Sequence, residues 1–429
     1  MTVARAQGKV GRLAHRTPLL RGLPPEVGVL SAIAFCVALG FGIVAPAIPV
    51  FARAFGVSAF LAGAVVSAFA MMRLISSPGA GAAINRIGER RVLAAGLAIV
   101  AVSSLAAGFS QSYVQLIVMR GLGGVGSSMF TVSAMALLLR TVGPDLRGRA
   151  TGAYQAGFLF GGVTGPALGG AVVGISIRAP FFVYAGTLAA ATAVCWFYLK
   201  DPPPREDGDP AGQPPSTQAV QPLPLRTALR DRAYWAALAT NLGNGFSIFG
   251  LRSALVPLFV VEGMRRGPSL TGVGFLVAAA VQAVLLLPAG RWADERGRRP
   301  AMILGSAASV AGMVLLAAGT GLWTFFAAMA VFGVAGAFLG PAPTAVVGDI
   351  THGRPGGTVV AVYQMVSDFG AIIGPLAAGL VLDAAGFGAA FAVGAVIVGL
   401  GLVAAVAMPE TLGRRDSGSP ASDSGTMAQ

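Results

Sequence analysis

Runs of about 20 apolar residues recur along this chain, and each is long enough to cross a hydrocarbon core about 30 Å thick as a helix. Because lipid cannot hydrogen-bond open backbone N–H and C=O groups, continuous apolar runs of this length predict helices rather than barrel strands. The expected spans are residues 28 to 50, 60 to 84, 92 to 110, 113 to 139, 149 to 174, 180 to 199, 234 to 261, 270 to 290, 300 to 319, 322 to 348, 358 to 382 and 386 to 408. The sequence therefore predicts an all-α integral membrane protein with 12 transmembrane helices.

Composition agrees with a membrane location for most of the chain. Apolar residues make up 55% and charged residues 11%, against about 25% charged residues in an ordinary soluble domain. Cys36 and Cys195 fall inside expected spans, where cysteine behaves as a small apolar residue. His15 and His352 lie outside the spans, in separate segments. These positions predict no disulfide, no metal site and no cofactor.

The positive charge of the chain is distributed unevenly. The formal net charge is +13, which in a soluble protein would suggest a nucleic-acid partner. With the N-terminus inside, most basic residues fall in cytoplasmic segments, and the external loops hold only Arg53, Arg178, Arg265 and Arg266. This asymmetry follows the positive-inside rule. We therefore expect no nucleic-acid binding and a multi-pass protein of the plasma or inner membrane with both termini in the cytoplasm.

A linker divides the chain into two halves. Residues 201 to 224 contain eight prolines and no apolar face, which predicts an extended, mobile tether. Residues 1 to 25 lead into the first apolar run without a small-residue cleavage site, so we expect a retained N-terminal segment. The expected units are a cytoplasmic N-terminal segment (1 to 27), an N-terminal six-helix bundle (28 to 199), a cytoplasmic linker (200 to 232), a C-terminal six-helix bundle (233 to 408) and a disordered cytoplasmic tail (409 to 429).

The two halves repeat each other at a constant offset of 209 residues. The matched positions include Gly81 and Gly290, Gly88 and Gly297, Arg90 and Arg299, Gly124 and Gly333, Tyr154 and Tyr363, Gln155 and Gln364, Gly161 and Gly370, Gly165 and Gly374, Pro166 and Pro375, and Gly170 and Gly379. A constant offset across distant regions predicts two pseudo-symmetric six-helix bundles. Two related bundles with a binding site at their interface are typical of secondary transporters.

Four motifs occur in an order that resembles a known family. The loops GAAINRIGERR (81 to 91) and GRWADERGRRP (290 to 300) are similar to two copies of a G-x-x-x-D-R-x-G-R-R signature. Span 4 contains RGLGGVG (120 to 126), and span 5 contains GGVTGPALGG (161 to 170), which is similar to the antiporter motif of exporters. Over residues 28 to 408 the chain resembles the major facilitator superfamily, in particular its twelve-helix drug:proton antiporter branch.

The resemblance implies that the two signature loops gate the transporter. In the family, an acidic loop residue meets a helix N-terminus of the opposite half and latches the halves in the outward-facing state. Here Asn85 replaces the first acid, and Glu89 and Glu295 stand at usually basic positions. The alternative is that the first loop serves only as a positively charged cytoplasmic loop. The expected gating residues are Gly81, Asn85, Arg86, Gly88, Arg90, Gly290, Asp294, Gly297 and Arg298.

The antiporter motif consists of small residues with one proline. Its residues are Gly161, Gly165, Pro166, Gly169 and Gly170. Glycines on one face of a membrane helix let a neighbouring backbone approach closely. The resemblance implies that this face packs on helix 8 of the other half and seals the inward side while the exporter faces out, with the repeated face of span 11 opposite span 2.

Ionisable residues inside spans are costly and therefore indicate function. Arg73 in span 2 and Asp368 in span 11 lie at similar depths of about 15 Å, counted at 1.5 Å per residue. Since the resemblance implies that helices 2 and 11 are neighbours, we predict an Arg73–Asp368 ion pair. Protonation of Asp368 would weaken the pair and supply a proton switch. The alternative is a permanent pair that only holds the halves in register.

Two further arginines lie inside spans. Arg120 in span 4 has no acidic residue in the spans of its own half, so we expect it to face the cavity. The resemblance implies that a span 4 arginine takes part in substrate or proton handling, and Arg120 is therefore expected to act in proton coupling with Asp368 and Arg73. Arg252 in span 7 is expected to extend its side chain to the lipid headgroups. Glu262 and Asp383, at outer boundaries, are expected to be solvated. With three embedded arginines and one embedded acid, a neutral or anionic amphiphile is favoured over a cationic substrate.

Polar side chains among many Phe and Met residues indicate a cavity for bulky apolar ligands. The candidates are Gln155, Asn241, Asn244, Gln282, Tyr363 and Gln364. The sequence favours a transporter, not an enzyme, that exports hydrophobic or amphiphilic small molecules by proton antiport, with alternating access and as a monomer. Its expected partners are the small-molecule substrate, protons and the lipid bilayer. The alternatives are a proton-coupled importer or uniporter of an organic metabolite, a lipid transporter, a channel, and a membrane enzyme or receptor.

Overall fold

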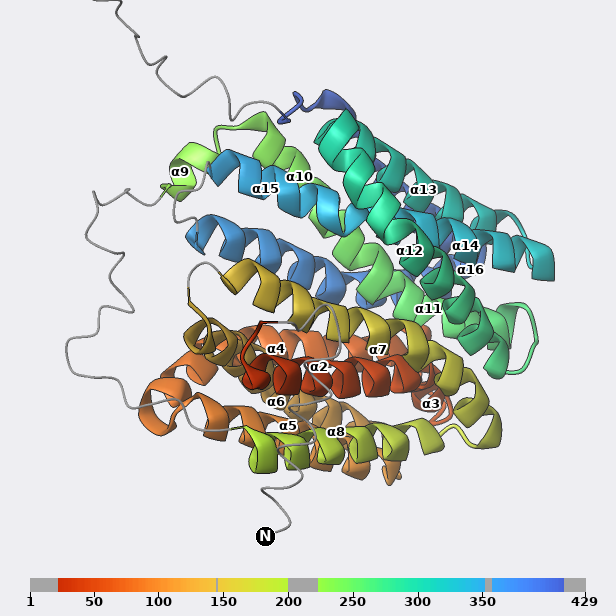
Figure 1. The fold of residues 1–429 in the computed structure, drawn as a ribbon. Helices are drawn as coiled ribbons and strands as arrows, with labels where there is room; N and C mark the ends of the chain where they lie inside the picture. Colours follow the sequence, from red (N-terminus) through yellow and green to blue (C-terminus); the bar gives the residue numbers. More distant parts are fainter. Residues whose placement is uncertain (1–21, 144–145, 200–222, 352–356, 413–429) are drawn as a thin grey trace, which may run out of the picture.

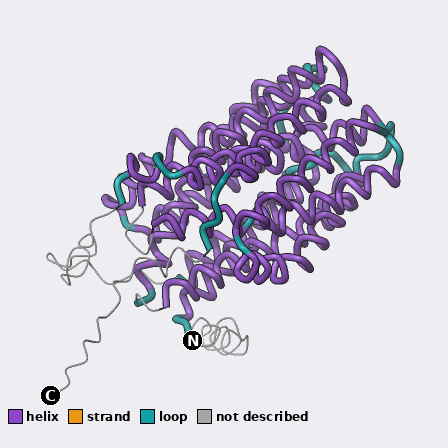
Figure 2. Tube along the Cα trace, turned by 90° about the horizontal axis from the view of Figure 1, so that it is seen from above, coloured by secondary structure: helices purple, strands orange, loops and turns teal. Residues whose placement is uncertain are grey.

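A computed structural model describes residues 22–143, 146–199, 223–351 and 357–412. The regular elements in these ranges are all helices, and no strand is drawn there (Figure 2). The predicted all-α fold is therefore confirmed. The predictions for the N-terminal segment, the linker and the tail fall largely outside the described residues.

Six spans form the N-terminal half, which is the lower half of Figure 1. The first span is α2 (Pro25–Val44) continued by α3 (Ala47–Arg53), and the others are α4 (Ala59–Ile87), α5 (Glu89–Gly108), α6 (Tyr113–Thr141), α7 (Arg147–Ile175) and α8 (Ala179–Tyr198). These bounds match the expected spans closely, because long apolar runs define helices well even where their ends are uncertain.

The C-terminal half contains less regular helices. A short α9 (Leu225–Ala228) precedes the seventh span, which consists of α10 (Arg232–Asn244), the π-helix η3 (Gly245–Arg252), α11 (Ser253–Leu258) and the π-helix η4 (Phe259–Gly263). The next spans are α12 (Ser269–Arg296), α13 (Arg298–Ala318), and α14 (Leu322–Leu339) followed by α15 (Pro341–Thr351). The last helix, α16 (Gly357–Ala407), is broken at Gly386, where φ is 82° and ψ is 178°, so it supplies the last two spans.

A single glycine makes the tight turn between the second and third spans of each half. Gly88, with φ 86°, is the one residue between α4 and α5, and Gly297, with φ 118°, is the one residue between α12 and α13. Glycine adopts such positive φ values without the steric cost that a Cβ would add. The two turns are related by the 209-residue offset, so the repeat seen in the sequence is also a repeat of local backbone conformation.

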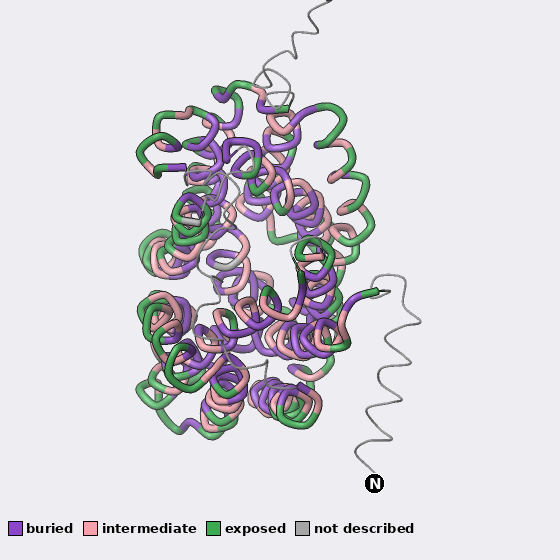
Figure 3. The backbone as a smooth tube through the Cα atoms, turned by 60° about the vertical axis from the view of Figure 1, so that its left-hand side comes forward, coloured by how far each residue is buried: buried purple, intermediate pink, exposed green. Residues whose placement is uncertain are grey.

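The two halves meet along two seams. One seam is formed by α4 and α16, and the other by α7 and α12. We call the end of the molecule where α2 begins and α16 ends the terminus end, and the opposite end, with Arg53 and Gly386, the far end. Within each half, buried residues lie in the interior and exposed residues surround them (Figure 3). Each half is therefore a bundle with its own core.

Backbones of the two halves approach most closely in the part of each seam that lies near the far end. In the first seam, Gly63 of α4 lies against the backbone carbonyl of Pro375. In the second seam, Gly272 of α12 lies against Gly170 and the carbonyl of Pro166. Since the 209-residue offset relates Gly63 to Gly272 and Pro166 to Pro375, the two seams repeat one contact. Glycine is required at both positions because a Cβ would collide with the facing backbone.

Towards the terminus end the same four helices are apart. A Cβ added at Gly81 of α4, Gly152 of α7 or Gly290 of α12 would have no neighbouring atom within 4 Å. In the described part of the chain, the hydrogen bonds and ion pairs between the halves lie at mid-depth or at the far end. The molecule is thus closed at the far end and open at the terminus end.

The antiporter motif packs mainly inside its own half. Gly161, Gly165 and Gly169 face the backbone of α2, between Phe35 and Ile43. In this conformation, of the motif residues, only Pro166 and Gly170 reach α12, and the packing of the whole face on helix 8 stays a prediction for the outward-facing state. The repeated face of α16 behaves alike, because Gly370 and Gly374 pack on the seventh span and only Pro375 and Gly379 reach α4.

This division of contacts predicts different effects for two glycine substitutions. Gly165→Leu places a Cβ 2.7 Å from the carbonyl oxygen of Leu39 and should destabilise the N-terminal half by about 1–3 kcal/mol, as overpacking does. Gly272→Leu should leave each half intact but force the far end open. Thermal unfolding in detergent measures the first effect.

Opening is measured by maleimide labelling of a cysteine placed at Leu258, which is 3% exposed at the first seam. The native Cys36 and Cys195 are replaced by alanine in the parent protein. Gly272→Leu should label faster than the parent with little change in unfolding temperature. Equal labelling rates would show that the Gly272 contact does not hold the far end closed.

Candidate functional site

An ion pair crosses the first seam at mid-depth. Arg73 is the central residue of the 29-residue α4, about 21 Å from either helix end at 1.5 Å per residue. Its Nη2 donates to Oδ1 of Asp368 on α16, and the two side chains are 34% and 30% exposed. Beside it, the Ser67 hydroxyl donates to the carbonyl oxygen of Ile372 at 2.6 Å. The predicted contact is present, and its role in proton coupling stays a prediction.

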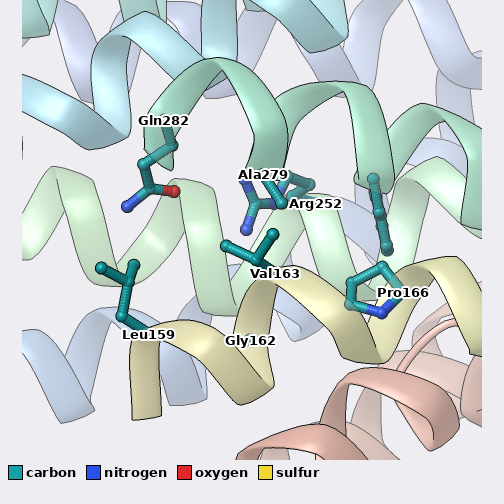
Figure 4. A pocket seen from close by; sticks show the side chains of 8 residues that line it. Leu159, Gly162, Val163, Pro166, Arg252, Ala279 and Gln282 are labelled. Atoms are coloured by element: carbon teal, nitrogen blue, oxygen red, sulfur yellow. The ribbon is translucent and has the colours of Figure 1, made fainter. Parts of the chain in front are cut away.

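The second seam carries no charged pair at the matching place. The 209-residue offset relates Arg73 to Gln282 of α12 and Asp368 to Leu159 of α7. Gln282 and Leu159 line a pocket between the halves, and both side chains point into it (Figure 4). The two seams therefore share a backbone arrangement but differ in chemistry at the same depth.

The pocket in the second seam has a cavity volume of about 80 Å³. Its walls come from three spans, and its lining residues are Leu159, Gly162, Val163, Pro166, Arg252, Phe275, Ala279 and Gln282. Arg252, the last residue of η3, lies about 16 Å from the far end of its span. Its guanidinium carbon is 5.6 Å from the centroid of the Phe275 ring. The expectation that Arg252 reaches the lipid headgroups is therefore wrong.

The π-helix explains the direction of Arg252. Gly245 and Gly250 turn their backbones to α16, where a Cβ on Gly250 would lie 2.8 Å from the Cα atom of Gly374. Arg252, two residues after Gly250, is about half a turn round the helix and so faces away from α16, towards α12. Sequence periodicity at 3.6 residues per turn cannot find a π-helical segment, although such segments are frequent at functional sites.

The predicted cavity residues divide into two groups. Asn241 is 4% exposed and its Nδ2 donates to the carbonyl oxygen of Tyr363 at 2.7 Å. Tyr363, also 4% exposed, has its hydroxyl 3.3 Å from that of Thr344. These two residues hold helices of the C-terminal half together and do not line this pocket, so their assignment to a substrate cavity stays a prediction.

The other group lies closer to the seams. Gln155 and Gln364 are exposed and stand one helical turn before Leu159 and Asp368, so they share the seam faces of α7 and α16. The Oδ1 atom of Asn244 is buried and has no hydrogen-bond partner among the described residues. Of the six candidates, Gln282 alone is a lining residue of the pocket.

Arg120 lies inside the N-terminal half. The residue is 2% exposed, and its guanidinium carbon is 4.5 Å from the centroid of the Phe69 ring on α4. Its Nε is buried without a hydrogen-bond partner in the described part of the chain. The expectation that Arg120 faces the cavity is wrong for this conformation. Its participation in proton coupling stays a prediction.

Two ion pairs at the terminus end are related by the repeat, with their charges reversed. Glu89 accepts from Nη1 of Arg140 at 2.6 Å, and Nε of Arg298 donates to Asp349 at 3.4 Å. The offset relates Glu89 to Arg298 and Arg140 to Asp349. Glu89 is acidic where the signature loop usually has a basic residue, and the residue that faces it is an arginine. The ion pair is therefore kept in both halves, with the acidic and the basic partner exchanged.

The gating-loop residues make their contacts within their own half. Arg90 donates to the carbonyl oxygen of Trp196 at 2.7 Å, and Arg298 forms an ion pair with Asp294. Asn85 and Arg86 are exposed. The latch to the opposite half is thus not formed with the terminus end open, and it stays a prediction for the other conformation.

Glu410 anchors the second gating loop. Its carboxylate accepts hydrogen bonds from the backbone N–H groups of Arg298 and Arg299 at 2.8 and 3.1 Å. Burial of Glu410 acts to raise its pKa, but these and two neighbouring N–H donors outweigh burial and hold the pKa of Glu410 below its usual range. The anion therefore caps the first turn of α13, where the helix dipole favours negative charge.

A second charged contact joins the halves at the far end. Arg53 of α3 donates to both carboxylate oxygens of Glu262, at 2.7 and 3.0 Å. The partners are themselves 209 residues apart, so this pair joins symmetry-related positions. Beside it, Asp383 of α16 accepts from the backbone N–H groups of Ala59 and Phe60, both at 2.9 Å, and caps α4 of the other half. The expectation that Glu262 and Asp383 are only solvated is wrong.

The sequence and the fold are similar to those of known membrane proteins. A model of the Major Facilitator Superfamily matches residues 30–281 and 254–426. The chain belongs to the major facilitator superfamily. This membership agrees with the resemblance found in the sequence, and the protein is a membrane transporter rather than an enzyme.

Relatives within the superfamily differ in their named roles. The chain is 31% identical over 173 residues to multidrug resistance protein 2 of Bacillus subtilis (strain 168), a match that covers 40% of this chain and 43% of that protein. It is 28% identical over 330 residues to the synaptic vesicular amine transporter of Homo sapiens, covering 76% and 62%. The matches thus span less than two thirds of each relative.

A solved structure with the same fold comes from a bacterial homologue of the human lysosomal transporter Spinster, in an inward-facing and unoccupied conformation. The TM-score is 0.70 at 18% sequence identity, and the match covers 89% of this chain and 95% of the other. At this identity the likeness concerns the fold alone.

The Arg53–Glu262 pair can be tested by exchanging its charges. Arg53→Glu or Glu262→Arg should each shift the protein towards an open far end by about fivefold, because exposed ion pairs contribute only about 0.2–1 kcal/mol. The double variant Arg53→Glu/Glu262→Arg should restore closure, since the two positions are symmetry-related. Labelling of the Leu258→Cys protein measures closure. Additive effects in the double variant would mean that the two side chains are not coupled.

Proposed function

We propose that this protein exports hydrophobic or amphiphilic small molecules in exchange for protons, by alternating access. The Arg73–Asp368 pair across the first seam carries the proposal, because it is a protonatable contact between two bodies that must separate. By the positive-inside rule, the terminus end, with its many basic loops, faces the cytoplasm. The protein would then lie in the plasma or inner membrane with both termini in the cytoplasm, and its described conformation is open to the cytoplasm.

In the proposed cycle, a proton neutralises Asp368 and removes the attraction to Arg73. The contacts that remain at the far end are glycine packing, the Arg53–Glu262 pair and the Asp383 cap, each of modest strength. Loss of the mid-depth pair therefore shifts the balance between the two conformations. The relative named for multidrug resistance supports export, and each monomer contains both seams, so one chain suffices for the cycle.

The relative named as an amine transporter supports a second candidate substrate class. A cationic amine would be exported through the same cavity by the same exchange. The uncompensated Arg252 in the pocket opposes a cation there, because like charges at close range repel. A proton-coupled importer or uniporter remains the alternative that the transport experiment separates from export.

The test uses purified protein in liposomes with an imposed pH gradient and a panel of fluorescent amphiphiles. For the wild type, substrate movement should consume the gradient, with protons and substrate moving in opposite directions. Asp368→Asn should abolish gradient-driven transport and retain exchange of labelled for unlabelled substrate, because exchange needs no net proton movement. Asp383→Asn is the matched control, since it removes another carboxylate between the halves, and it should keep most gradient-driven transport.

Three results would contradict the proposal. If the Asp368→Asn protein still consumes the gradient during transport, the Arg73–Asp368 pair only holds the two halves in register. Wild-type transport that ignores the gradient would indicate a uniporter. Movement of protons and substrate in the same direction would indicate an importer.

A further inference from the structure

We propose that Arg252 and Gln282 form a subsite for the carboxylate of an anionic amphiphile. The inference rests on the proposed transport function and names the substrate class of the same cavity. The subsite lies in the second seam, at the depth where the first seam holds its ion pair. It determines which head group the transporter accepts.

Arg252 has no internal counter-charge in the described part of the chain. Its side chain makes no described ion pair or hydrogen bond, and the face of Phe275 is its identified partner. A cation–π contact of this kind contributes about 0.5–2 kcal/mol, which is less than a desolvated arginine needs. The residues that face Arg252 from α7 and α12 are apolar apart from Gln282. The pocket therefore holds a positive charge that no described residue neutralises.

The other two embedded arginines lie outside the pocket. Arg73 is paired with Asp368. Arg120 also lacks a described counter-charge, but it is 2% exposed inside the N-terminal half, where a ligand in the pocket does not reach it. Glu262 and Asp383 are engaged at the far end, and Glu89 and Asp349 at the terminus end. Of the embedded arginines, Arg252 alone lines the pocket between the halves, so a ligand is the remaining source of a counter-charge at mid-depth.

The donors suit a planar carboxylate. A guanidinium presents parallel N–H groups that match two carboxylate oxygens, and the amide of Gln282 points into the same pocket (Figure 4). A cavity of about 80 Å³ holds a head group but not a drug-sized body, since pockets for drug-sized ligands measure about 300–1,000 Å³. The apolar body would extend along Leu159 and past Gln155, towards the terminus end where the helices are apart.

The experiment compares three head groups on one ring system. The probes are 2-naphthoate, naphthalene-2-carboxamide and 2-naphthylmethylammonium, and binding to the full-length protein in nanodiscs is measured by calorimetry and thermal shift. The wild type should bind the carboxylate about 10- to 100-fold more tightly than the amide, as expected for a hydrogen bond to a charged group. Dodecanoate serves as a second carboxylate, and its affinity relative to 2-naphthoate distinguishes a fatty acid from an aromatic acid as the source of the head group.

Substitutions test whether Arg252 and Gln282 cause the preference for the carboxylate. Arg252→Gln should abolish the preference for the carboxylate, and Arg252→Lys should keep part of it, because the charge remains and the two-pronged geometry is lost. Gln282→Glu should also abolish it, by giving Arg252 an internal carboxylate without removing the arginine. Arg266→Gln removes the same charge from the exposed far end and should bind like the wild type.

Several results would overturn the subsite while leaving export intact. These are tighter binding of the ammonium or the amide, absence of carboxylate binding to the wild type, and an unchanged preference in Arg252→Gln and Gln282→Glu. Transport of a neutral fluorescent amphiphile by the same preparations separates the two proposals. If neutral transport also fails in the wild type, the proposed export function is overturned with it.

Discussion

Close backbone contact at four small-residue positions holds the two halves together at the far end. Gly63 against Pro375, and Gly272 against Gly170, allow helices of opposite halves to approach without intervening side chains. Such contacts lack the directional bonds that would fix a single state, and dispersion forces at close range supply their stability. At these glycine contacts the halves can therefore separate without leaving polar groups unsatisfied, as the proposed alternating access requires.

Approximate symmetry makes the departures from symmetry informative. The repeat preserves the glycine contacts, the one-residue turns at Gly88 and Gly297, and the ion pairs at the terminus end, although those pairs exchange their charges. At mid-depth the repeat is broken, because one seam has an ion pair and the other has Gln282, Leu159 and a pocket. Duplication thus supplied two equivalent seams, and substitutions at a few side chains gave them different chemistry.

The sequence predicted the features that depend on the free-energy cost of placing polar groups in lipid. It predicted fewer of the features that depend on the direction in which a helix face or a side chain points. Apolar runs gave the spans, and the expense of charges in lipid identified Arg73 and Asp368 as partners from their depths, once the resemblance made helices 2 and 11 neighbours. The contact of the α7 glycine face with α2 was not predicted, because a smooth face shows that some helix approaches but does not identify which. Arg252 was misplaced because a π-helix changes the direction of side chains without altering the apolar pattern.

Coupling between protons and substrate does not need contact between Asp368 and the pocket. The halves are separate bodies joined along two seams, so a rigid rotation that opens one seam at the far end also opens the other. A proton at the first seam and a ligand at the second therefore bias the same equilibrium, and each changes the affinity for the other by the same factor. In this arrangement an anionic ligand between Arg252 of one half and the apolar face of α7 in the other holds the second seam together. In the proposed cycle, protonation of Asp368 would loosen the first seam, so the proton and the ligand would weaken each other's binding, as the proposed exchange requires.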